Sequence, residues 1–243
     1  MEETTLGGLF GGRISYRQLR SGHRTGFEPV LLAASVPARA GERVLEAGTG
    51  AGAALLCLAA RVPGVVGIGL ERDATLARLA AENFAGNRFG DLFSVQGDAT
   101  AQPFAPGSFD HVMTNPPWFE AASTASADER RALAHQEDGE GGLERWVAAL
   151  VGVLRPKGSI TLVLPAASFA RAAAALVLAQ CGGVTLLPLW PRAGVAAKMV
   201  VLSARKGSKA PARVMPGLVL HDKGAISPAA QAILRDGQAS SGA

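Results

Sequence analysis

Cysteine is scarce in this sequence, and its scarcity removes several classes of protein from consideration. Only Cys57 and Cys181 occur among 243 residues, and neither has another cysteine nearby or a spacing typical of metal ligands. The sequence therefore predicts two core thiols in a reducing, cytoplasmic compartment. It predicts neither a disulfide framework nor a metal site.

Long uninterrupted apolar runs are also missing, although hydrophobic residues make up 48% of the chain. Residues 51–70 come closest, but Arg61, Pro63 and Gly64 interrupt them, and alanine and glycine outnumber leucine and isoleucine among them. This composition predicts the helix and strand of a core rather than a membrane span. The first five residues contain no basic region followed by an apolar one, so we expect no secretory signal and no membrane partner.

No linker rich in proline and serine divides the chain, which predicts one domain. We expect an entry segment at 1–40, a core at 43–204 and a basic tail at 205–243. Strand patterns recur at 92–96, 109–114, 158–164, 183–190 and 196–204, and helix patterns at 142–154, 167–181 and 228–235. The alternation predicts an α/β, Rossmann-like fold: a mixed seven-stranded sheet with helices on both faces and a terminal antiparallel hairpin.

A strand that runs into a glycine-rich turn marks the first candidate binding site. Residues 43–47 lead into Gly48, Gly50 and Gly52, and an Ala/Leu-rich helical pattern follows. Glycines allow the backbone to turn sharply beside a ligand, and the next helix points free N–H groups at it. The spacing differs from the dinucleotide pattern Gly-x-Gly-x-x-Gly, and the carboxylate of Glu46 would repel a pyrophosphate. It suits a ligand with an ammonium group, such as the methionine end of S-adenosylmethionine.

Two further acids end later strands of the predicted sheet. Glu71 follows an apolar run about 20 residues past the glycines, where nucleotide-binding α/β folds place a carboxylate on ribose hydroxyls. Asp98 closes the next strand, and we expect it to accept a hydrogen bond from the adenine amine of the cofactor. Three acids at three successive strand ends favour a binding site over solvated strand ends.

The most specific pattern is Asn-Pro-Pro-Trp at residues 115–118, directly after the strand at 109–114 and about 65 residues past the glycine turn. The side-chain oxygen of Asn115 and the carbonyl of Pro116 can both accept hydrogen bonds from one planar NH2 group, while Trp118 stacks on the ring that bears it. The two prolines fix φ and keep these carbonyls out of a helix. The pattern therefore predicts a site that orients an amino group.

With these residues in place, the sequence resembles the class I, Rossmann-like methyltransferases that use S-adenosylmethionine. More narrowly, it is similar to the bacterial tRNA1(Val) adenine-N6 methyltransferase family. The resemblance covers about residues 8 to 235 and includes the segments at 11–18 and 26–34. It implies a methyltransferase domain, S-adenosylmethionine as the cofactor, tRNA as the partner and transfer of a methyl group to an exocyclic amino nitrogen, adenine N6 in the first place.

The resemblance also assigns residues. Asn115, Pro116 and Trp118 would be catalytic, Asn115 would lie beside the cofactor as well, and Phe27 and Glu28 would line the entry to the same site. Family members usually have a small hydroxyl residue or Ile and then Asp where this chain has Phe27 and Glu28. At the position of Trp118 they more often have Tyr or Phe.

Three other interpretations stay open at this point. Cytosine N4 and guanine N2 in ribosomal RNA, and the glutamine amide of a protein, also present a planar nitrogen that the same turn could orient. A noncatalytic RNA-binding protein could keep the fold. A dinucleotide oxidoreductase is disfavoured by the glycine spacing.

Positive charge gathers near both ends of the chain, within a net charge of +4. The candidate RNA-binding residues are Arg13, Arg17, Arg20, Arg24, Arg130, Arg131, Lys198 and Lys206. A fold that brings both ends of the chain to one side of the cofactor cleft would build a surface suited to phosphates. Residues 119–141 have no strong apolar period, which predicts a long loop beside the catalytic turn.

Overall fold

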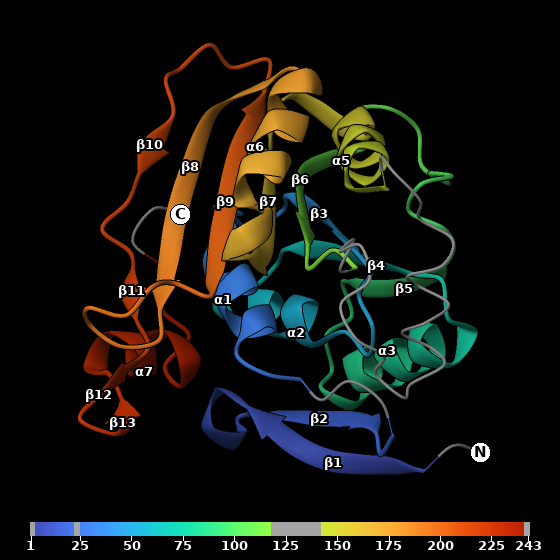
Figure 1. Ribbon diagram of the computed structural model, residues 1–243. Helices are drawn as coiled ribbons and strands as arrows, with labels where there is room; N and C mark the ends of the chain where they lie inside the picture. The colour runs from blue at the N-terminus through green and yellow to red at the C-terminus, as the bar shows by residue number, and fades with distance from the viewer. Residues whose placement is uncertain (1–2, 22–24, 118–141, 241–243) are drawn as a thin grey trace.

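The computed structural model describes residues 3–21, 25–117 and 142–240, and one mixed β-sheet runs through it (Figure 1). The strands lie in the order β10-β8-β9-β7-β6-β3-β4-β5, with β11 also paired to β8. Their bounds are β3 Arg43–Ala47, β4 Val66–Glu71, β5 Leu92–Gln96, β6 Phe109–Thr114, β7 Leu154–Pro165, β8 Cys181–Trp190, β9 Met199–Lys206, β10 Arg213–Val214 and β11 Leu218–Val219. All neighbours are parallel except β9, which is antiparallel to both β7 and β8.

The predicted fold class is confirmed. Two of the nine strands, β10 and β11, have only two residues each and extend the edge formed by β8, so the seven longer strands match the sequence pattern. The predicted hairpin is the β8–β9 pair, although its strands are displaced from 183–190 and 196–204. The connection between them spans residues 191–198, and β9 begins only at Met199.

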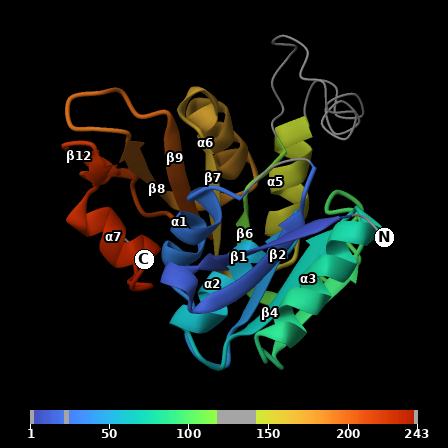
Figure 2. The same cartoon turned by 90° about the horizontal axis from the view of Figure 1, so that it is seen from below.

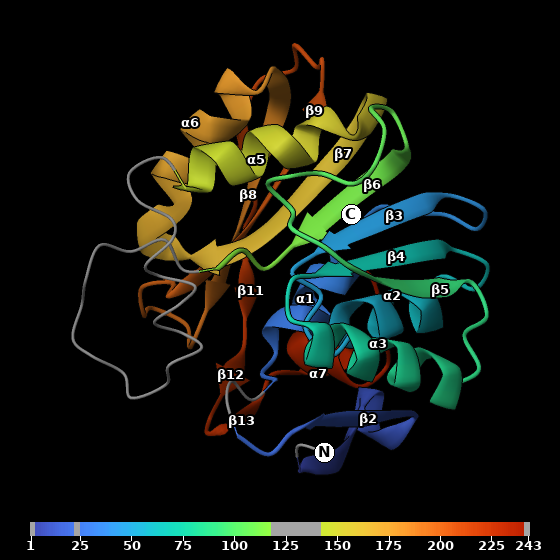
Figure 3. The ribbon, with the colours of Figure 1, turned by 90° about the vertical axis from the view of Figure 1, so that its right-hand side faces the viewer.

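Helices cover both faces of the sheet, as Figures 2 and 3 show. Their bounds are α1 Glu28–Ala34, α2 Ala53–Arg61, α3 Ala74–Gly86, α5 Gly142–Gly152, α6 Phe169–Leu178 and α7 Pro228–Leu234, with short 3-10 turns η1 Phe10–Gly12 and η2 Ala166–Ser168. Side chains of β3 alternate between the two apolar layers: Val44 packs with α1 and α2, and Leu45 packs with α5 and α6. Among the described residues, no helix is long and apolar enough to cross a membrane.

The entry segment forms a β-hairpin that the sequence pattern did not predict. Strands β1 (Thr4–Leu9) and β2 (Ile14–Leu19) pair antiparallel, and they lie beside α3 in Figure 1. Asn87 at the end of α3 bonds Ser15 through both amide atoms, and Asn83, one turn earlier, bonds Arg17 in the same way. Strand β2 therefore runs toward the amino end of α3, which is the end that faces the carboxyl edge of the sheet.

The tail after β9 returns along the edge of the sheet. Strands β10 and β11 follow β8, a small hairpin of β12 (His221–Asp222) and β13 (Ala225–Ile226) comes next, and α7 packs against α1. In Figure 3 the β12–β13 hairpin lies on the side to which the carboxyl ends of β3, β6 and β7 point. The tail therefore contributes residues to the rim of that edge.

Candidate active site

The carboxyl edge of the sheet brings the sequence-predicted site together. Ala47 pairs with Leu70 on one side and with Thr114 on the other, so β3, β4 and β6 end at the same level. Parallel strands that end together place the turns that follow them side by side. The glycine turn, Glu71 and Asn115 thus share one edge, and Asp98 follows β5 two residues beyond its end.

The glycine turn has the backbone conformation that its sequence predicted. Gly48, Gly50 and Gly52 have φ values of 72°, 54° and 87°, a region that side chains with a Cβ rarely adopt. A Cβ on Gly52 would lie 2.5 Å from the ring of Phe84, so only glycine lets the turn pack on α3. A Cβ on Gly50 would meet nothing within 4 Å, which leaves an open surface there.

Glu46 lies beneath this turn and is almost completely buried. Its Oε2 accepts hydrogen bonds from the Thr49 hydroxyl (2.7 Å) and the Leu55 N–H (3.2 Å). Burial raises the pKa of Glu46 to about 8, and the negative charge of Glu71 adds to the effect, although the two hydrogen bonds act in the opposite direction. The carboxyl is therefore mostly protonated at neutral pH, whereas the sequence alone had indicated an ionised carboxylate. A cation bound beside it would favour ionisation.

Glu71 and Asp98 are more accessible than Glu46. The two carboxylate oxygens of Glu71 accept from the backbone N–H groups of Gly50 (2.8 Å) and Asp73 (3.0 Å), which fixes the side chain across the glycine turn. Each carboxylate oxygen has two lone pairs, so Glu71 keeps capacity for ligand hydroxyls. Partial burial would raise the pKa of Asp98, but hydrogen bonds from Thr100 and the positive charge of Arg72 hold it below its ordinary value.

Asn115 presents an unused hydrogen-bond acceptor at this edge. The residue is half-buried and Pro116 is buried. The Oδ1 atom of Asn115 is shielded from solvent and, within the part of the chain that the structure describes, has no hydrogen-bond partner. A buried acceptor without a partner is costly and is uncommon in folded proteins. Trp118, the predicted stacking residue, lies outside the described residues.

Trp146 lies between the glycine turn and the turn at Asn115, and the sequence pattern did not single it out. A Cβ on Gly48 would lie 3.8 Å from the ring of Trp146 and 4.0 Å from the carbonyl oxygen of Asn115. The indole N–H of Trp146 donates to the Thr114 hydroxyl (3.3 Å), which in turn donates to the Ala47 carbonyl (2.8 Å). The only sequence signal was a single tryptophan on the buried face of the helix predicted at 142–154.

Tyr16 of the entry segment lies near Glu46. The Tyr16 hydroxyl and the Thr25 hydroxyl are 3.0 Å apart, and Thr25 N–H donates to the Gln18 side chain (3.1 Å). Burial raises the pKa of Tyr16 to about 12, and the charge of Glu46 contributes to the rise while the bond to Thr25 opposes it. Tyr16 therefore lies within electrostatic range of Glu46 and stays neutral.

Phe27 and Glu28 lie where the entry segment meets α1. Phe27 is the N-cap residue of α1 and is 37% exposed, and its ring faces His221 of β12 at a centroid distance of 6.2 Å. The carboxylate of Glu28 folds back over Gly26, where a Cβ would lie 2.3 Å from its Oε2. Their predicted place at the entry fits this geometry, and their contact with a cofactor stays a prediction.

The structure does not bring the candidate RNA-binding residues to one place. Lys198 precedes β9 at the carboxyl edge, where its carbonyl accepts from Ala166 N–H (2.8 Å). Lys206 ends β9 at the opposite edge, and its amine donates to the carbonyls of Val151 and Leu154 (both 2.8 Å). Arg20 follows β2 on the carboxyl side and forms an exposed ion pair with Glu3.

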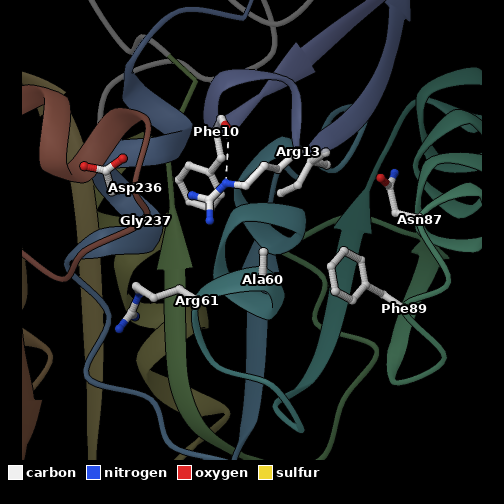
Figure 4. Close-up of a pocket in the computed structure, with 9 residues that line it drawn as sticks. Phe10, Arg13, Ala60, Arg61, Asn87, Phe89, Asp236 and Gly237 are labelled. Atoms are coloured by element: carbon white, nitrogen blue, oxygen red, sulfur yellow. Dashed lines mark hydrogen bonds between the residues drawn. The ribbon is translucent and has the colours of Figure 1, made fainter.

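Arg13 also lies away from the carboxyl edge, in a hollow of about 370 Å³ near the end of α2 (Figure 4). Its guanidinium donates to the Arg235 carbonyl (2.5 Å) and covers the ring of Phe10 at 5.4 Å. Arg17 is exposed on β2. Three further candidates, Arg24, Arg130 and Arg131, lie outside the described residues. For this whole group RNA binding stays a prediction.

Comparison with known proteins identifies a family that this sequence matches. The family described as "Methyltransferase domain" matches residues 44–137. The tRNA1(Val) (adenine(37)-N6)-methyltransferase of Aeromonas salmonicida is 30% identical over 189 residues, which are 77% of this chain and 79% of that protein. The enzyme of the same name from Aeromonas hydrophila is 34% identical over 151 residues, 61% of this chain and 62% of its own length. The first curated relatives are thus matched over about 60% of their length.

A solved structure has the same fold. The crystal structure of a predicted O-methyltransferase from Agrobacterium tumefaciens superposes with a TM-score of 0.73 at 24% identity, covering 88% of this chain and 97% of that one. At this identity the likeness concerns the arrangement of the sheet and helices.

Proposed function

This chain belongs to the class I S-adenosylmethionine-dependent methyltransferase family that includes the tRNA1(Val) adenine-N6 methyltransferases, and we propose that it transfers a methyl group from S-adenosylmethionine to an exocyclic amino nitrogen of RNA. Adenine N6 in tRNA is the substrate we favour, because the sequence relatives carry that activity in their names.

One observation carries the proposal: the Oδ1 of Asn115, beside the glycine turn, is buried and has no hydrogen-bond partner among the described residues. An amide oxygen can only accept hydrogen bonds, so its natural partner is a donor that arrives with the substrate. A planar NH2 group offers two N–H donors. The backbone carbonyl of Pro116, the next residue of the turn, can accept a hydrogen bond from the second donor. The two acceptors of the turn together favour an amino group over a hydroxyl, which has one donor, and over a carbon acceptor, which has none.

The residues at the carboxyl edge fit the proposed cofactor. Glu46 and the glycine turn hold the methionine end, because a buried carboxyl beside a cation becomes an ionised partner. Glu71 accepts from the ribose hydroxyls, and Asp98 accepts from the adenine amine. The open surface at Gly50 leaves room for the ligand between these groups.

The chain contributes to the reaction by positioning and electrostatics. When bound, S-adenosylmethionine would supply a methyl group on a sulfonium, whose C–S bond would break toward sulfur as the C–N bond forms, and the amine would pass its proton to solvent. Asn115 and Pro116 orient the amine and stabilise the positive charge that develops on nitrogen, and Trp118 holds the ring of the base.

The test is a methyl-transfer assay with labelled S-adenosylmethionine and separate tRNA, ribosomal RNA and protein fractions, followed by digestion to the modified unit. We expect label in N6-methyladenosine from tRNA. Asn115→Ala should lower the single-turnover rate by about 10²-fold or more while S-adenosylhomocysteine binds as in the wild type, because the lost contact strengthens only as charge develops. Label in cytosine, guanine or glutamine would mean that this unit, and not adenine, is the substrate. An unchanged rate in Asn115→Ala would refute the role of the amide.

A further inference from the structure

Two aromatic side chains from distant parts of the chain meet at the rim of the carboxyl edge. Phe27 precedes α1, and His221 begins the β12–β13 hairpin of the tail. Their ring centroids are 6.2 Å apart with a tilt of 39°. Phe27 is nevertheless 37% exposed. The pair therefore offers an accessible aromatic face.

The position of the pair is fixed from both sides. Helix α1 packs on β6, the strand that leads into Asn115, and on its neighbour β7, so Phe27 at the start of α1 is held beside these strands. His221 is anchored by its backbone N–H (3.1 Å) and its ring Nδ1 (3.3 Å), both of which donate to the Pro191 carbonyl. A carbonyl only accepts, so Nδ1 carries the proton in this contact. An aromatic face with fixed orientation loses little conformational freedom when a ligand stacks on it.

The neighbouring loop at residues 191–198 carries positive charge. Residues 191–198 connect β8 to β9 and contain Arg192 and Lys198 but no acid. Arg192 and Lys198 are both exposed. The loop contacts the β12–β13 hairpin through the Pro191 carbonyl, which accepts from the His221 N–H. A cationic loop next to an aromatic face is the combination that binds single-stranded nucleic acid, because the cations pair with phosphates and each base has a face that can stack.

We infer that the Phe27–His221 pair and the loop at 191–198 form the surface that binds an unpaired nucleotide next to the one being methylated. The base stacks on the exposed face of the pair, because rings 6.2 Å apart and tilted are already in contact with each other and leave no slot between them. Arg192 and Lys198 bind the flanking phosphates. This assignment rests on the proposed function.

The experiment measures binding of two RNA probes by fluorescence anisotropy: a stem-loop with an unpaired, adenine-containing loop and a blunt duplex of equal length. Phe27→Leu, which keeps an apolar side chain but no ring, should weaken stem-loop binding about tenfold and leave duplex binding unchanged. Phe27→Tyr should bind the stem-loop within about twofold of the wild type. Phe93→Ala is the matched control, since Phe93 is an exposed aromatic residue (52%) on the edge strand β5.

Two further measurements make the result decisive. Arg192→Gln with Lys198→Gln should lower the salt dependence of stem-loop binding by about two units of slope. The thermal midpoint should stay unchanged in every variant, which separates stacking from misfolding. Equal binding of the stem-loop by Phe27→Leu and wild type would overturn the inference, and so would an equal loss on the duplex.

Failure of the inference and failure of the proposed function give different results. If the wild type methylates RNA but Phe27→Leu binds the stem-loop normally, only the inference falls. If the wild type methylates protein and not RNA, while neither probe distinguishes the variants, both fall, and the aromatic pair would then belong to a surface that receives a polypeptide.

Discussion

Glu46→Gln should change the pH dependence of stability in a direction fixed by the burial of this carboxyl. Its pKa rises from 4.5 to about 8 in the folded protein. Between these values the native state binds a proton that the unfolded state has released, so the free energy of unfolding falls as the pH rises. Each pH unit in this window removes about 1.4 kcal/mol, and from pH 5 to pH 7 the wild type should lose between about 2 and 3 kcal/mol through Glu46 alone.

Glutamine reproduces the protonated form. Its amide oxygen can accept from the Thr49 hydroxyl and the Leu55 N–H, as Oε2 does now. The stability difference between Glu46→Gln and wild type should therefore grow with pH, because other titrating groups cancel in the difference. Urea unfolding at pH 5, 6, 7 and 8 measures it. Glu82→Gln, at an exposed carboxyl (57%) on α3, is the control and should give a flat difference. A flat difference for Glu46→Gln would refute the protonated, buried carboxyl.

The proton on the Glu46 carboxyl should be released when the ligand binds. If the amino group of S-adenosylhomocysteine ionises Glu46, binding at pH 7 releases about one proton. Calorimetry in buffers with different ionisation enthalpies counts that proton, and Glu46→Gln should release none. Wild-type binding without proton release would mean that the amino group binds elsewhere.

Four smaller experiments test other parts of the site. Glu71→Ala should weaken S-adenosylhomocysteine binding about tenfold or more by calorimetry, because a carboxylate that accepts two ribose hydroxyls contributes on the order of 1.5–3 kcal/mol; unchanged affinity would remove it from the site. Trp146→Phe keeps an aromatic ring but loses the hydrogen bond to Thr114, the residue before Asn115, so the methylation rate should fall severalfold with KM for the cofactor unchanged. Gly52→Ala should cost about 2 kcal/mol or more in urea unfolding, since φ is 87° and Phe84 is too close. Lys198→Glu should weaken RNA binding more than Lys206→Glu, and equal effects would contradict RNA binding at the carboxyl edge.

Local sequence was sufficient to predict the turns of the site. Gly48, Gly50 and Gly52 adopt positive φ because no other residue does so at low cost, and this preference can be read without the fold. The alternating pattern likewise predicted the order of strands and helices. The sheet class followed from the pairing rules for parallel strands.

Features that depend on distant contacts could not be predicted. The β1–β2 hairpin is held by Asn83 and Asn87, which are about 70 positions away in sequence. Lys198 and Lys206 look equivalent in the sequence, yet an antiparallel strand of eight residues separates them by roughly 25 Å, at opposite edges of the sheet. The pKa of Glu46 depends on how deeply the fold buries it, which no spacing rule reveals. In the sequence, Trp146 could not be distinguished from an ordinary core residue of a helix.

The placement of β9 between β7 and β8 has a consequence for biosynthesis. When a ribosome has released the chain as far as Pro165, β7 is complete but one of its edges has no partner, because β9 is synthesised about forty residues later. At ordinary translation rates that interval is a few seconds. Throughout it, an apolar strand displays a row of free N–H and C=O groups that another nascent chain could pair with. Slow codons or truncation between residues 165 and 206 should therefore favour aggregation, and chaperone dependence should be greatest for this part of synthesis.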